Sequence, residues 1–175
     1  MLFRSLGTNA FGQGVAVTPL QLAVASAAIA NDGKLMAPHI VRAVVNNNQQ
    51  FDTPPRLIGM PISFKTANTL TEMLASSLEK EASDSLVEGY RVAGKTGTAE
   101  IPTPYGYSSS ATNASFVGWG PVDDPKFLVY IWLEKPTTSP WGSVVAAPVF
   151  RQAVEHLVVL MDIPPDDVRR KIFTQ

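Results

Sequence analysis

Apolar side chains recur at helical spacing in three parts of the chain. The first predicted helix runs from about Thr18 to Asn31. Thr18-Pro19-Leu20-Gln21 has the pattern of a capping box with proline at the first helical position, and Gly33 stands where helices commonly end. The residues between these two signals are apolar on all sides. We therefore expect this helix to be buried on most of its faces.

The second and third predicted helices are apolar on one face only. The second runs from about Phe64 to Glu81 with Ser63 as its cap, and the third from about Pro148 to Met161. From Pro164 to Gln175 we expect one more helical turn or a frayed end. The apolar face of the second helix consists of Ala67, Leu70, Met73, Leu74 and Leu78, and that of the third consists of Phe150, Val154, Leu157 and Met161.

Three segments between these helices have the pattern of strands. They are Arg91 to Glu100, Asn113 to Gly120, and Phe127 to Leu133. The last is apolar throughout, so we expect it to be covered on both faces. The stretch from Pro121 to Pro125 predicts a hairpin turn. The link from Pro102 to Thr112 is rich in Pro, Gly, Tyr and Ser, and we expect it to be mobile.

Residues 34–60 carry no clear helical pattern and are predicted to be extended or loop. Asn46 to Gln50 predicts a polar turn, and Pro54-Pro55 a stiff connection. Helices followed by an antiparallel meander and a covering helix indicate an α+β domain of about three strands with flanking helices. We expect residues 1–175 to be part of one domain, with a helical and loop segment at 1–60 and the second helix, the meander and the C-terminal helix at 61–175.

Composition narrows the function classes. Hydrophobic residues make up 45% of the chain and charged residues 17%, enough for a packed core. A net charge of -1 gives no electrostatic argument for nucleic acid, and we expect no such partner. The absence of cysteine removes thiol catalysis, thiolate metal sites and disulfides. Leu20 to Ala30, the longest apolar run, is too short to span a bilayer, and Met1 to Ser5 lacks signal-peptide features.

One stretch of the chain has side chains suited to binding a ligand or to catalysis. Lys95-Thr96-Gly97-Thr98 lies inside a predicted strand, where a glycine is locally unfavourable. Gly97 removes a side chain where another backbone can lie against the strand, Thr96 and Thr98 offer hydroxyls, and Lys95 offers a positive charge. Such an edge suits a peptide that adds as a strand and presents a carboxylate. The other interpretation is a plain edge strand with a solvated lysine.

The remaining polar candidates have simpler interpretations. His39 and His156 have no nucleophile or carboxylate near them in sequence and are expected to be packing or surface residues. Asp123-Asp124 and Asp166-Asp167 stand beside prolines and predict a turn and a helix start, not metal ligands. Glu100 is expected at a solvated strand end, with a place at the border of a cleft as the alternative. We expect no metal and no cofactor.

The segment from Val92 to Glu100 resembles the third active-site motif of penicillin-binding proteins. Other stretches resemble class B members of that family in the same order along the chain. They are Phe11-Gly12-Gln13-Gly14, Thr18 to Ala23, and Ala30 to Gly33 with Pro38, all before the motif, then Ala114 to Trp119 and Trp141 to Phe150 after it. The likeness covers nearly the whole chain. It implies the C-terminal part of the transpeptidase domain of a peptidoglycan D,D-transpeptidase.

The resemblance also implies roles for the motif. Lys95 would lie behind the nucleophile and supply positive potential, Gly97 would let the substrate approach, and the hydroxyls of Thr96 and Thr98 would bind a carboxylate. The backbone N–H of Thr98 would be one of two oxyanion-hole donors, each typically worth about 3 kcal/mol. The implied ligands are peptidoglycan stem peptides and β-lactams, and the parent would work with division or elongation proteins. It would act at the extracytoplasmic face of the bacterial plasma membrane, anchored and exported through a region outside this segment.

The family's other two motifs, Ser-x-x-Lys and Ser-x-Asn, have no convincing copy in these 175 residues. Ser77-Leu78-Glu79-Lys80 matches the first in letters, but it ends an amphipathic helix, and Glu79 and Glu81 favour a charged Lys80 where a base must be neutral. We therefore expect no nucleophile in this chain and no activity from it alone. A serine β-lactamase, a β-lactam sensor and a structural division-complex module remain as alternatives. We also expect self-association, because Phe127 to Leu133 is an uncharged strand whose partner strands in the family would come from elsewhere.

Overall fold

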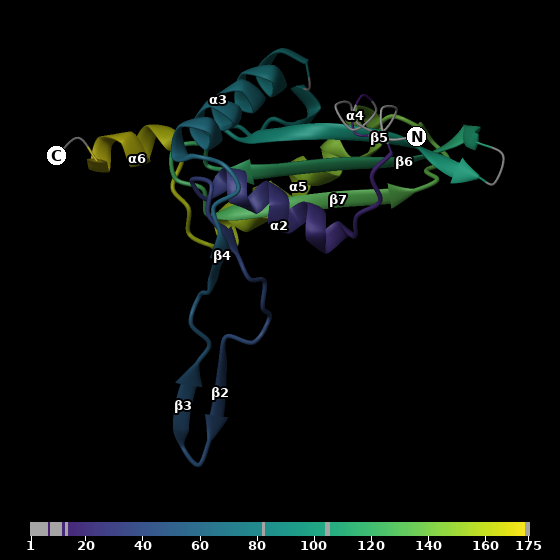
Figure 1. Cartoon of the computed structure of the whole chain (residues 1–175). Helices are drawn as coiled ribbons and strands as arrows, with labels where there is room; N and C mark the ends of the chain where they lie inside the picture. Colours follow the sequence, from purple (N-terminus) through teal and green to yellow (C-terminus); the bar gives the residue numbers. More distant parts are fainter. Residues whose placement is uncertain (1–6, 8–11, 13, 82, 104–105, 174–175) are drawn as a thin grey trace.

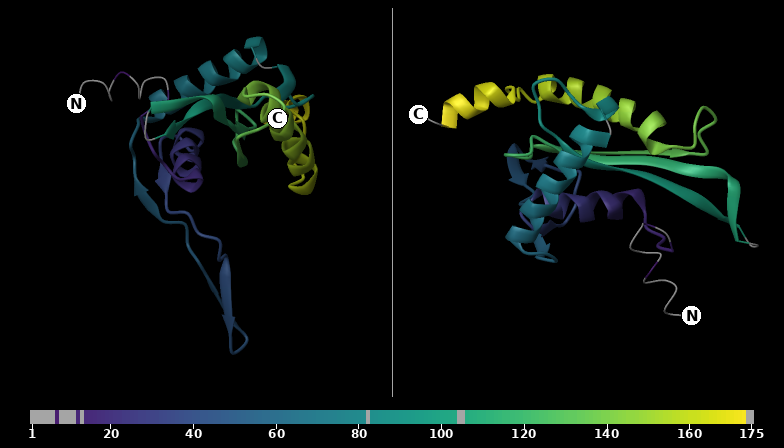
Figure 2. Two further views of the ribbon diagram at one scale, coloured as in Figure 1. Left: turned by 90° about the vertical axis from the view of Figure 1, so that its right-hand side faces the viewer. Right: turned by 90° about the horizontal axis from the view of Figure 1, so that it is seen from above.

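The computed structural model describes residues 7, 12, 14–81, 83–103 and 106–173; Phe11, Gln13 and the first six residues, which the sequence analysis discussed, lie outside this part. Its centre is a three-stranded antiparallel sheet in the order β5-β6-β7, formed by Ala93–Thr103, Gly106–Gly120 and Phe127–Glu134. Helices lie on both faces of this sheet (Figures 1 and 2). The predicted α+β class, with an antiparallel sheet and flanking helices, is confirmed.

The helices divide between the two faces of the sheet. On one face lie α2 (Pro19–Ala30) and α3 (Phe64–Glu81). On the other lie the short α4 (Gly142–Val145) and α5 (Ala147–Leu160), and α6 (Asp166–Phe173) extends from the same layer (Figure 2). A one-turn helix, Ser83–Ser85, follows α3.

The two faces of the sheet are built from alternate residues of β6. Phe116 is fully buried against Phe150 of α5, with ring centroids 4.5 Å apart. Trp119, on the opposite face, packs with Ala75 of α3 and Ala93 of β5. Because strand side chains alternate between faces, the partners in β6 assign Ala93 to Glu100 of β5, and all of β7, to one face or the other.

The capping residues and the glycine end signal in the sequence predicted the helix ends correctly. The backbone N–H of Gln21 donates to Thr18 Oγ1 at 3.2 Å, and the N–H of Thr18 donates to Gln21 Oε1 at 2.8 Å, so the capping box is confirmed. The N–H of Thr66 donates to the hydroxyl of Ser63 at 3.1 Å, which confirms the cap of α3. Gly33 has φ +85, the left-handed conformation that a glycine end signal requires.

The expected burial of the helices was partly wrong. In α2 only Ser26 and Ala28 are buried, and Leu20 is 60% exposed, because α2 contacts the sheet and α3 and no described element covers its outer side. Met73 of α3 is 63% exposed, because Ala67, Thr71, Ala75 and Leu78 form the buried stripe instead. Met161 is 44% exposed, because α5 ends at Leu160 and Val158 takes the last buried position.

The final part of the chain is more regular than a frayed tail. The eight residues of α6 form a helix that begins at Asp166.

The segment Gly142–Leu160 is long and apolar enough to cross a membrane by length and composition alone. Phe150, Val154 and Val158 are nevertheless buried in the core cluster beneath the sheet, which is the environment of a core helix.

Residues 34–60 form an arm where we predicted extended chain or loop. In it β1 (Leu35–Met36) pairs with β4 (Leu57–Gly59), and β2 (Ala43–Asn46) pairs with β3 (Gln49–Asp52). The polar turn is confirmed, with Asn47 and Asn48 both at positive φ. The arm projects away from the sheet (Figure 1), and most of its side chains are exposed.

Two expectations about the central sheet were wrong. The link between the first two predicted strands is mostly strand instead, since β5 continues to Thr103 and β6 begins at Gly106, with Pro102 paired to Tyr107 in the backbone register. The strand β7 is not covered on both faces. It lies at the sheet edge, all its residues are at least partly accessible, and Trp132 is 44% exposed. The hairpin turn from Pro121 to Pro125 is confirmed, since it joins β6 to β7.

Candidate functional site

The predicted motif lies in β5, one of the two edge strands of the sheet (Figure 1). Lys95 faces Val117 of β6, and Thr98 faces Ala114. Among the described residues no strand pairs with the outer edge of β5. Alternate backbone N–H and C=O groups of an antiparallel edge strand point away from its neighbour, so this edge can receive an extended peptide.

The motif divides its side chains between the two faces of the sheet. Lys95 and Gly97 are on the face of α2 and α3, and Thr96 and Thr98 are on the face of α4 and α5. Lys95 is exposed, and its Nζ lies 3.3 Å from the hydroxyl oxygen of Thr96 and donates to the Thr96 carbonyl at 3.2 Å. The ammonium group therefore bends around the strand edge and lies beside a hydroxyl from the opposite face.

Thr98 is held by a contact that no motif in the sequence predicts. The backbone N–H of Gly142, the first residue of α4, donates to Thr98 Oγ1 at 3.1 Å. The loop before Gly142 is tied to β6 as well, since the hydroxyl of Thr112 donates to the carbonyl of Pro140 at 2.9 Å. The one signal in the sequence was the glycine inside the family-like stretch from Trp141 to Phe150.

Packing within the sheet gives a second reason for glycine at position 97, besides the predicted approach of a substrate. A Cβ at Gly97 would lie under 3.0 Å from the hydroxyl oxygen of Ser115, its partner on β6. Ser115 therefore occupies part of the space that Gly97 leaves open. Because β5 is an edge strand, a role for Gly97 in substrate approach stays a prediction.

An ion-pair network holds the start of β5 in place. Arg91 pairs with Glu72 and Glu79 of α3, each at 2.8 Å, and its backbone N–H donates to Asp166 at the start of α6, also at 2.8 Å. The hydrogen bonds that the Arg91 guanidinium donates to Glu79 and Glu72 raise its pKa above the usual value. Arg91 thereby connects α3, β5 and α6 four residues before Lys95.

The other candidates lie away from this strand. Lys80 is exposed, as expected of a solvated lysine, and Glu79 beside it pairs with Arg91. His39 is exposed on the arm, and His156 is an exposed residue whose Nδ1 lies 2.7 Å from the Gln152 carbonyl.

The acidic candidates have the structural roles that were predicted. Asp123 pairs with Arg169, Asp124 pairs with Lys126 at 2.8 Å, and Asp166 begins α6. Glu100 is exposed on β5. In the described part of the chain no three His, Asp or Glu side chains group as a metal site would require.

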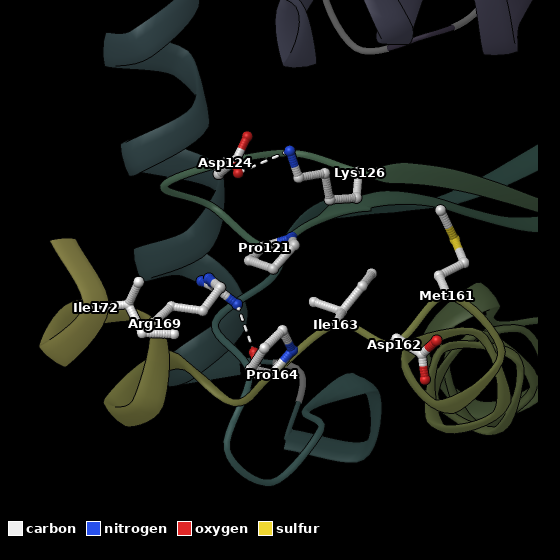
Figure 3. Close-up of a pocket in the computed structure, with 9 residues that line it drawn as sticks. All are labelled: Pro121, Asp124, Lys126, Met161, Asp162, Ile163, Pro164, Arg169 and Ile172. Carbon is white, nitrogen blue, oxygen red and sulfur yellow. Dashed lines mark hydrogen bonds and ion pairs between the residues drawn. The ribbon is translucent and has the colours of Figure 1, made fainter.

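Two hollows formed by the described residues lie away from the motif. A cavity of about 280 Å³ lies between the β6–β7 turn, the end of α5 and α6, where Met161, Ile163 and Ile172 surround it (Figure 3). A larger one of about 600 Å³ is lined by Arg91, Tyr90 and Arg151 among others. Lys95 to Thr98 line neither of these hollows and lie on the edge strand β5.

Comparison with known proteins identifies the family. A profile of the penicillin binding protein transpeptidase domain matches residues 4–155. Stage V sporulation protein D of Bacillus subtilis is 37% identical over 163 residues, covering 90% of this chain and 25% of that protein. A peptidoglycan D,D-transpeptidase FtsI homolog of Mesostigma viride is 30% identical over 174 residues, covering 90% of this chain and 29% of that protein.

The fold agrees with this assignment. Penicillin binding protein 3 of Mycobacterium tuberculosis, solved in complex with ampicillin, superimposes with a TM-score of 0.78 at 30% identity, covering 88% of this chain and 37% of that one. The chain thus spans between a quarter and a third of the two curated relatives. With the profile match over most of its length, the chain belongs to the penicillin binding protein transpeptidase domain family, as a class B member.

Proposed function

We propose that this chain forms one wall of the active site of a peptidoglycan D,D-transpeptidase. The observation that carries the proposal is the exposed edge of β5, where the Lys95 ammonium and the Thr96 hydroxyl lie 3.3 Å apart. A cation and hydroxyl donors beside unpaired backbone groups suit a peptide that ends in a carboxylate. The name of the Mesostigma viride relative and the ampicillin complex of the Mycobacterium tuberculosis relative support the same substrate class.

Lys95, Thr96 and Thr98 all take part in the proposed reaction. A serine outside these 175 residues attacks the carbonyl carbon between the two terminal D-alanines, D-alanine leaves, and an amine of a neighbouring strand later accepts the acyl group. The Thr98 N–H stabilises the oxyanion, the hydroxyls of Thr96 and Thr98 bind the substrate carboxylate, and Lys95 contributes positive potential behind the nucleophile.

The same proposal implies where this chain lies in its parent protein, and where and with which partners the parent works. Residues 1–175 are the C-terminal part of one transpeptidase domain, in which residues 1–60 are the helical and loop segment before the motif and residues 61–175 carry the strand edge and its supporting helices. The parent protein works at the extracytoplasmic face of the plasma membrane, anchored outside this segment, with division or elongation proteins as partners. No cofactor is required, because a serine acyl-enzyme needs only general base and oxyanion assistance.

Covalent labelling of the complete parent protein tests the proposal. Fluorescent penicillin should form a stable adduct with the parent, and Lys95→Ala and Thr98→Val should slow its formation at least tenfold, since each removes a charge-assisted contact. Lys80→Ala, on exposed α3, is the matched lysine control and should label like the wild type. Absence of an adduct would refute the proposal, and rapid hydrolysis of a chromogenic cephalosporin would indicate a serine β-lactamase.

A further inference from the structure

We propose that Gly142 is a positioning residue that acts through the hydroxyl of Thr98, an inference that rests on the proposed function. The backbone N–H of Gly142 donates to Thr98 Oγ1 at 3.1 Å. Thr98 is 44 residues away in sequence and sits on the edge strand. The contact therefore links the α4 segment to the carboxylate-binding end of the site.

The chemistry of a hydroxyl explains what this contact does. A threonine hydroxyl has one proton to donate and two lone pairs that accept. When the Gly142 N–H occupies one lone pair, the proton must point elsewhere, and in the described part of the chain it meets no acceptor. The hydroxyl is thus prepared to donate to an incoming carboxylate, and accepting one hydrogen bond makes it a better donor of the next.

Only glycine can bring its N–H to this place. Gly142 is buried, and a Cβ on it would lie 2.5 Å from the carbonyl oxygen of Ser115 and closer still to that of Gly97. Both atoms belong to the backbone of the central sheet and cannot rotate away. Any larger residue must therefore lift α4 from β5 and lengthen the hydrogen bond to Thr98.

The loop that carries Gly142 is held from a second side. The hydroxyl of Thr112 donates to the carbonyl of Pro140 at 2.9 Å, and the N–H of Lys135 donates to the carbonyl of Thr112 at 3.1 Å. In the sheet register Thr112 faces Glu100, two positions along β5 from Thr98. Its hydroxyl offers a way to loosen the loop without placing any new atom beside the strand edge.

A double-mutant cycle in the complete parent protein separates positioning from packing. The measurement is the second-order rate of acylation by benzylpenicillin for the wild type, G142A, T98V, and the double variant. We expect T98V to be about 10- to 100-fold slower, as for loss of a hydrogen bond to a charged group. G142A should be about tenfold slower alone and less than about twofold slower when added to T98V. Ser143→Ala, at the exposed next position of α4, is the control and should match the wild type.

A second substrate reports on the carboxylate directly. Benzylpenicillin methyl ester has no free carboxylate, so G142A and the wild type should react with it at similar rates. Equal losses with both substrates, or additive losses in the cycle, would mean that Gly142 serves packing alone and would overturn the inference. If G142A does not fold, Thr112→Val replaces it in the same cycle, and the same non-additive pattern with T98V is required. A wild type that does not react would refute the proposed function itself, whereas a reactive wild type with an unaffected G142A refutes only the positioning role.

Discussion

The space above Gly97 allows the packing role and the substrate role of this glycine to be tested separately. The perturbation is Gly97→Ala in the complete parent protein. The new Cβ would lie under 3.0 Å from the Ser115 hydroxyl oxygen but 3.8 Å from the Ser115 Cβ, which is an ordinary contact. Removing the Ser115 hydroxyl with Ser115→Ala should therefore relieve the overlap within the sheet.

The expected magnitudes follow from this geometry. One methyl group forced against a neighbouring side chain costs about 1–3 kcal/mol, and Ser115 can reduce the cost by rotating. For a domain of 150–250 residues, 2 kcal/mol corresponds to a fall in Tm of about 4–8 °C, and the larger domain of the complete parent should show a smaller fall. G97A combined with S115A should recover most of that loss, because the clashing atom is gone. Gly97→Val should destabilise more than G97A, since it adds two further methyl groups.

Acylation should not recover with stability. If Gly97 is present so that a substrate backbone can approach β5, the methyl group of G97A still occupies that space when Ser115 is also changed. We expect the double variant to melt near the wild type but to be acylated at least tenfold more slowly, about 1.4 kcal/mol of lost binding or transition-state stabilisation. The two measurements are thermal unfolding and the rate of penicillin labelling, with S115A alone as the control.

Recovery of both properties would refute the reasoning. A double variant with wild-type melting and wild-type labelling would mean that Gly97 only makes room for Ser115. The edge of β5 would then lose its proposed role as the surface on which the substrate lies.

The remaining predictions concern the isolated chain and the support of β5. The 175-residue chain should form no covalent adduct with labelled penicillin in intact-mass spectrometry, and a stoichiometric gain abolished by Ser77→Ala would contradict this. The isolated chain should also self-associate, because the described residues leave the outer edge of β7 unpaired. Light scattering coupled to size exclusion tests this, and a monomer at all concentrations that unfolds cooperatively would argue against it. Arg91→Met should lower the free energy of unfolding in urea by about 0.5–2 kcal/mol, since it breaks two ion pairs that solvent partly screens. Arg151→Met, which removes the exposed pair with Glu155, is the control and should leave the urea midpoint close to that of the wild type.

Signals that act over a few residues were sufficient to predict much of this protein. Thr18 with Gln21, Ser63 and Gly33 satisfy or end the helix beside them, so their effect does not depend on the rest of the fold. The uninterrupted apolar run from Phe127 and the Lys95 motif likewise identified strands and a candidate site without tertiary information. The family followed from the order of several such stretches along the chain.

Whatever depends on a distant neighbour was decided by the tertiary structure. Met73 is exposed because α3 approaches β5 through small residues, and the last apolar strand is partly exposed because it is an edge. The hydrogen bond between Gly142 and Thr98 spans 44 residues, and no local pattern encodes it. Side-chain periodicity reports which face of an element is apolar, but only packing between elements selects what that face meets and how close it can come.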